Sequence, residues 1–174
     1  TTVTHRNFNR IDNFSAFLTA SPAVGSWHPQ LTVGVQKQWA KIEHNGETLQ
    51  MDTPLFFCTL NNGIQLPYHW TLSTDINFQS KGDYQNIYMY QNVFMMNATL
   101  TKSFLNEHLS IHLQGIDLTH GRKDGNRIYN KHMNMDVANV SDSRELRFTI
   151  RYKFNTAKSK YKGKGAAAEE IKRL

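Results

Sequence analysis

The chain has 174 residues, 39% of them hydrophobic, and a formal net charge of +6 at pH 7. No apolar run approaches the roughly 18 to 20 residues of a membrane-spanning helix, which excludes a helical membrane protein but not one that spans with short strands. Six basic and two acidic side chains in residues 155–174 supply +4 of the charge, so the remainder is nearly balanced. A nucleic-acid partner is therefore not expected, because a basic surface would depend on the tail alone.

The first expected strands cover residues 3–18, 31–39 and 54–62. The second of these alternates clearly, with Leu31, Val33, Val35 and Trp39 on one face and Lys37 as the misfit among them. The single cysteine, Cys58, lies in the third strand and is interpreted as a small apolar side chain rather than a reactive thiol.

Residues 69–78 and 93–101 are the next expected strands, and the first of them has one wholly polar side. Its apolar face holds Trp70, Leu72, Ile76 and Phe78. The polar face is formed by His69, Thr71, Ser73, Asp75 and Asn77. Such a strand needs an apolar medium on one side and water or polar groups on the other.

The last two expected strands cover residues 109–118 and 145–154. The alternation changes phase at Gly115, which predicts a β-bulge there. In the final strand the polar face carries Arg147, Arg151 and Lys153, opposite Leu146, Phe148, Ile150, Tyr152 and Phe154. No segment before the tail shows a 3.6-residue period, so the body is predicted to be all-β.

The connections between these strands alternate in length. Compact turns are expected at 22–29, 62–67 and 104–107, and longer polar connections at 44–53, 80–85 and 119–143. Short periplasmic turns and long extracellular loops are typical of outer-membrane barrels. If seven strands span the membrane, residues 126–138 are not an eighth spanning strand but part of a hairpin outside the membrane. Seven strands are too few for a roomy barrel, since about eight already fill their interior with side chains.

These observations predict an antiparallel, up-and-down (meander) sheet that forms the C-terminal strands of a transmembrane β-barrel, possibly truncated from a larger one. Residues 1–155 would be this barrel segment and residues 156–174 a basic, Lys/Gly-rich periplasmic tail. The lumen would be lined by His69, Thr71, Ser73, Asp75, Asn77, Arg147, Arg151 and Lys153. The aromatic girdles would be formed by Trp39, Trp70, Phe78, Tyr152 and Phe154.

Other interpretations of the same residues remain open. A soluble β-sandwich or small-barrel binding module would use the apolar faces as a core instead. His108 and His112 have a zinc-like spacing, but on a strand they would lie about 13 Å apart. His69, Ser73 and Asp75 contain the residue types of a hydrolase, yet one strand does not bring them into contact. No catalytic residue, metal or cofactor is expected.

The C-terminal half carries specific motifs. The segment Arg144-Glu-Leu-Arg-Phe-Thr-Ile-Arg-Tyr-Lys-Phe-Asn155 and the following Lys-Tyr-Lys-Gly-Lys-Gly-Ala tail resemble the end of the outer-membrane β-barrel family related to TonB-dependent receptors. Lys102-Ser-Phe104 and Ile116-Asp-Leu118 are similar to further segments of that family. The resemblance implies a nutrient or solute transporter or receptor in the bacterial outer membrane. Its partners would be membrane lipid, upstream barrel strands, a plug domain and a periplasmic energy-transducing protein.

Overall fold

The computed structural model describes residues 10–140 and 142–154. Within these ranges the protein consists of β-strands that pair antiparallel throughout, which confirms the predicted fold class. No helix in the described part of the chain is long and apolar enough to cross a membrane. Residues 3–9 of the first expected strand and the predicted basic tail, residues 156–174, lie outside the described ranges.

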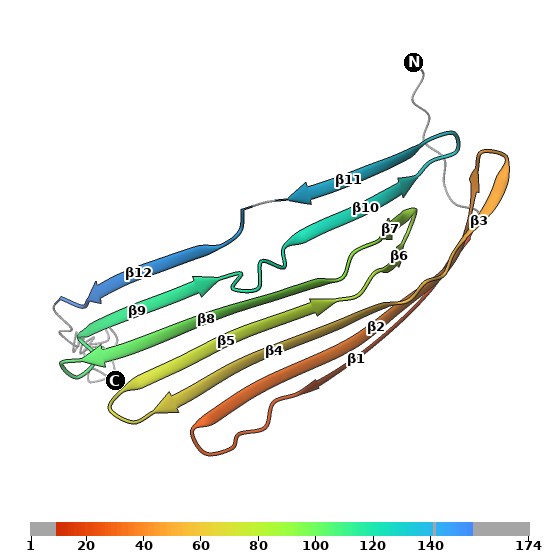
Figure 1. Cartoon of the computed structure of the whole chain (residues 1–174). Coiled ribbons are helices and arrows are strands. Elements are labelled where there is room, and N and C mark those ends of the chain that lie inside the picture. The colour runs from red at the N-terminus through yellow and green to blue at the C-terminus, as the bar shows by residue number, and fades with distance from the viewer. Residues whose placement is uncertain (1–9, 141, 155–174) are drawn as a thin grey trace, which may run out of the picture.

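Seven strands form one broad sheet in which spatial order follows chain order (Figure 1). They are β1 (Ile11–Ala20), β2 (Trp27–His44), β4 (Leu55–Leu66), β5 (Trp70–Gln79), β8 (Val93–Phe104), β9 (Leu109–Ile116) and β12 (Glu145–Tyr152). This is an up-and-down meander, because each strand pairs with the one before it in the sheet path. We call it the main sheet.

The long connections contain strands of their own. The short strand β3 (Glu47–Met51) pairs with the end of β2 through an Asn45-Gly46 hairpin with φ of 51° and 85°, values that Asn-Gly accommodates. A second, four-stranded sheet has the order β11 (Asn134–Val140), β10 (Lys123–Tyr129), β7 (Ile87–Met89) and β6 (Gly82–Tyr84). Residues 80–85, expected as a plain polar connection, thus begin a hairpin, and 126–138 fall in another.

A small buried core joins the second sheet to the end of β2. Ala40, Ile42 and Met51 are buried there, and Tyr88 and Tyr129 pack against them. The buried Gln38 donates from Nε2 to the carbonyl of Gln85 (2.8 Å) and accepts from its amide (2.6 Å). The hairpins β6–β7 and β10–β11, which the predicted topology places outside the membrane, are therefore packed against the end of β2.

The prediction of a compact turn at residues 62–67 is wrong. The strand β4 continues to Leu66, because Asn62 and Gly63 pair with Thr74 and Ser73 of β5 instead of turning. The turn follows at residues 67–69, and His69 has a φ of 60° within it. His69 is therefore an exposed turn residue and not the first residue of the polar face of β5.

The prediction of a β-bulge at Gly115 is also wrong. Gly115 pairs in regular register with Ala98 on one side and Leu146 on the other. The change of phase arises two residues later, where Asp117 has a φ of 46° and leaves the strand. A Cβ at Gly115 would lie 2.6 Å from Leu118, so the glycine makes room for a side chain that folds back.

Candidate functional site

One face of the main sheet is apolar from edge to edge. The register aligns Ile64, Leu72, Leu100, Leu113 and Phe148 in a single row across five strands. Phe148 is 62% exposed and Leu113 44% exposed, so no layer formed by the described residues covers this row. An uncovered apolar face of this extent requires an apolar surrounding. We call it the apolar face.

Cys58 and the first two strands belong to the same face. Cys58 pairs with Val33 and Phe78, and Leu18 pairs with Val33 on the other side. The thiol is free and half-buried in this setting. This agrees with its interpretation as a small apolar side chain.

The opposite surface, the polar face, carries polar side chains on the same five strands, although Phe17 of β1 and Phe57 of β4 also lie on it. A row of Gly63, Ser73, Thr99, Gln114 and Arg147 crosses the same five strands. Neighbouring side chains bond across the strands, as in Thr19–Thr32 (3.0 Å), Thr59–Asn77 (3.2 Å) and Thr101–His112 (3.0 Å). These bonds satisfy polar groups within the sheet and still leave the face half-exposed to water.

The expected lumen-lining residues are placed as follows. The polar face carries Thr71, Ser73, Asp75, Asn77, Arg147 and Arg151. His69 lies in a turn, and Lys153 follows the end of β12, where its amide donates to the carbonyl of His108 (2.8 Å). Thr99, Thr101 and Gln114 also lie on this face and were not singled out, although the alternation of their strands places them there.

The basic residues of β12 differ in their surroundings. The guanidinium of Arg147 is paired with Glu145 at 2.8 Å on the same strand, and both side chains are about half exposed. Such an exposed pair contributes little to stability. Arg151 has no ion-pair partner among the described residues, so it leaves a positive charge on the polar face.

Aromatic side chains gather near both ends of the apolar face. Trp70, Tyr152 and Phe154 lie at the short-turn end, and the rings of Tyr152 and Phe154 contact edge to face at 4.6 Å. Trp39 and Phe78 lie toward the long-loop end. A lysine accompanies each of these two tryptophans, with Lys102 Nζ 5.1 Å from the Trp70 ring and Lys37 Nζ 5.2 Å from the Trp39 ring.

The other candidate residues, considered for a zinc site or a hydrolase, are not brought together into such a site. His112 hydrogen-bonds Thr101 and Ser110 on the polar face, whereas His108 lies in the preceding turn near the Lys153 carbonyl. His69, Ser73 and Asp75 share no hydrogen bond among the described contacts. No group of three His, Cys, Asp or Glu side chains in residues 10–140 and 142–154 is placed to hold a metal ion.

Sequence reasoning noted Asp117 only within the Ile116-Asp-Leu118 segment and missed its role, which is to organise the connection after β9. Its carboxylate is 2% exposed and accepts from the amides of Gly121 (2.8 Å) and Arg122 (3.2 Å) and from the hydroxyls of Thr119 and Ser143. Desolvation raises the pKa of Asp117, but the hydrogen bonds outweigh it and hold that pKa below its ordinary value of 3.8. The signal in the sequence was the Asp in a loop rich in Thr, His and Gly.

Comparison with known proteins identifies the family of the chain. The model of the outer membrane protein beta-barrel family matches residues 1–152. No curated protein and no solved structure matches the chain. The match covers the whole of the main sheet, and its two-sided pattern is the one that membrane barrels require. The chain therefore belongs to the outer membrane protein beta-barrel family and resides in the bacterial outer membrane.

Proposed function

We propose that the chain forms part of the wall of a TonB-dependent-type transporter or receptor, through which a nutrient or another solute is taken up. The observation that carries the proposal is the polar row of Gly63, Ser73, Thr99, Gln114 and Arg147, which crosses five strands from β4 to β12 behind the apolar row of the same strands. Sequence motifs of the final strand and tail support the TonB-dependent type. In this arrangement the apolar face contacts membrane lipid and the polar face lines the lumen.

The edges and the polar face indicate where partners belong. Among the described residues β1 pairs only with β2 and β12 only with β9, which leaves one edge of each available. Unpaired edges are filled or covered in stable sheets. Upstream barrel strands would occupy these edges, a plug domain would pack on the polar face, and a periplasmic energy-transducing protein would drive transport.

A soluble sandwich would need a second sheet against the apolar face. The second sheet packs instead through Tyr88 and Tyr129 on Ala40 and Ile42, at the end of β2. The apolar face stays uncovered by the described residues, with Leu146, Phe148 and Ile150 each more than half exposed. This observation and the family membership favour the barrel.

Uptake can be tested in the native bacterium by measuring which solutes disappear from a defined medium. Cells that lack the protein should fail to deplete at least one solute, and disabling the energy-transducing protein should abolish the same depletion. Reversing two charges of the polar face, Arg147→Glu with Arg151→Glu, should change the uptake rate of a charged solute by about tenfold. Arg144→Glu, in the exposed connection before β12, serves as the matched control.

Two results would contradict the proposal. If every solute is depleted equally with and without the protein, it does not carry solute. If depletion depends on the protein but not on the energy-transducing partner, the wall belongs to a passive pore rather than to a TonB-dependent transporter.

A further inference from the structure

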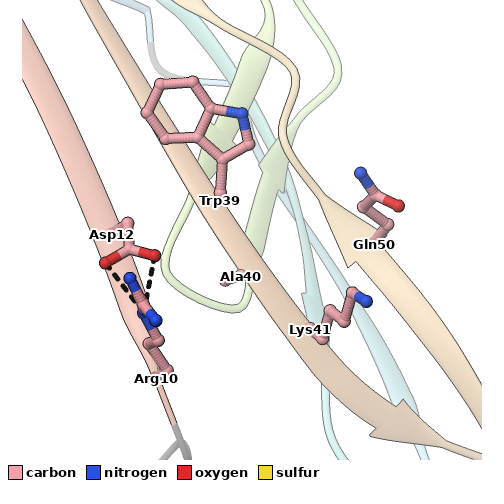
Figure 2. A pocket seen from close by; sticks show the side chains of 6 residues that line it. All are labelled: Arg10, Asp12, Trp39, Ala40, Lys41 and Gln50. Atoms are coloured by element: carbon pink, nitrogen blue, oxygen red, sulfur yellow. Dashed lines mark hydrogen bonds and ion pairs between the residues drawn. The ribbon is translucent and has the colours of Figure 1, made fainter.

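An open groove lies at the long-loop end of the apolar face. Figure 2 shows its lining, in which Arg10 and Asp12 come from β1 and the residue before it, Trp39 and Lys41 from β2, and Gln50 from β3. The groove has a volume of about 550 Å³. Register places Asp12 opposite Trp39 and Lys41 opposite Gln50, so these side chains share one surface.

That surface is a continuation of the apolar face. Along β2 the same side carries Val33 and Val35, then Lys37, Trp39 and Lys41. The face therefore changes along one strand from purely apolar to aromatic and cationic. This explains why Lys37 interrupts the alternation, since its ammonium lies 5.2 Å from the Trp39 ring at the boundary.

The charges of the groove favour an anionic ligand. Arg10 is paired with Asp12 at 2.8 Å, and both are largely exposed. Lys41 forms no ion pair with any described residue. Among the residues that line the groove, Arg10 and Lys41 are cationic and Asp12 is the one carboxylate, so the lining carries one net positive charge.

We propose that this groove binds the phosphorylated headgroup of a glycolipid in the outer leaflet of the outer membrane. The inference rests on the orientation in the proposed function, in which long loops face outward. Lys41 and Arg10 would contact the phosphate, Asp12 and Gln50 would bond sugar hydroxyls, and Trp39 would lie at the boundary between headgroup and acyl chains. Basic pockets at membrane level recognise anionic headgroups by this chemistry.

The proposal is tested with the full chain refolded in micelles, to which a bisphosphorylated glycolipid, its dephosphorylated form or inorganic phosphate is added. Bound lipid is measured by native mass spectrometry. The phosphorylated lipid should bind at least tenfold more tightly than the dephosphorylated one, and Lys41→Gln, alone or with Arg10→Gln, should remove that preference. Lys102→Gln is the matched control, because Lys102 accompanies Trp70 at the opposite end of the same face.

The outcomes separate this site from the proposed function. Equal binding of both lipid forms by a protein that inserts into vesicles would overturn the headgroup site and leave the barrel intact. Competition by inorganic phosphate at equal concentration would overturn it as well, because the groove would then bind any free phosphate.

Discussion

Replacing Leu100 by arginine should lower the free energy of unfolding from a lipid bilayer by about 2 to 4 kcal/mol, the cost of a basic side chain near the midplane of a barrel's lipid face. Leu100 lies near the middle of β8, between Leu72 and Leu113 in the apolar row. Neither neighbour offers a polar group to an arginine. The side chain would have to reach the headgroups or leave the membrane.

The adjacent Thr99→Arg is the control for this variant. Thr99 lies on the polar face opposite Ser73 and Gln114, where an arginine meets water and polar side chains. Its effect should be at most about 1 kcal/mol, as for other exposed substitutions. Guanidinium unfolding of both variants from vesicles measures the difference. Equal losses of unfolding free energy would show that the two faces of the sheet lie in the same medium.

The second large effect is expected at Asp117. Removing its carboxylate with Asp117→Ala leaves the amides of Gly121 and Arg122 without their acceptor, which should lower the free energy of unfolding by about 2 to 6 kcal/mol, at about 1 to 3 kcal/mol for each unsatisfied group. Hydrogen exchange of these two amides should rise together with the loss of stability. Asp142→Ala, an exposed aspartate of the same connection, should change neither quantity.

The same residue makes a pH-dependent contribution. Because the folded pKa of Asp117 lies below its ordinary value of 3.8, the stabilisation is fully present at pH values above that unfolded pKa. It is lost as the pH falls through the lower, folded pKa. Between pH 7 and pH 3 the stability difference between wild type and Asp117→Asn should therefore shrink. A difference that stays constant over this range would show that the carboxylate is not held ionised by its donors.

Strand alternation was the reliable signal for the fold. A strand with water on one side and lipid on the other must alternate at every residue, so residues 69–78, 93–101 and 145–154 could be recognised without a structure. Turns were harder, because Asn62 and Gly63 have turn composition but are held in β4 by Thr74 and Ser73 across the ladder. Tertiary pairing overrides local preference at such positions.

The same reason limits what could be predicted about the functional surface. Ser73 and Asn77 could be assigned to a polar face from their own strand, but the row that joins Ser73 to Arg147 depends on the register of four strands. The groove at Trp39 combines three strands and could not be derived from one. Buried groups such as Gln38 and Asp117 depend on contacts between connections that no periodicity encodes.

The assignment of one face to lipid and the other to the lumen is tested most directly by spin labels in a bilayer-inserted sample. Labels at Leu72, Ile76 and Phe148 should collide with oxygen dissolved in lipid and be shielded from a water-soluble nickel complex. Labels at Ser73 and Asn77, next to them on the opposite face, should show the reverse preference. Water exposure at Leu72, Ile76 and Phe148 alike would contradict the central claim that the apolar face of this sheet is embedded in the outer membrane.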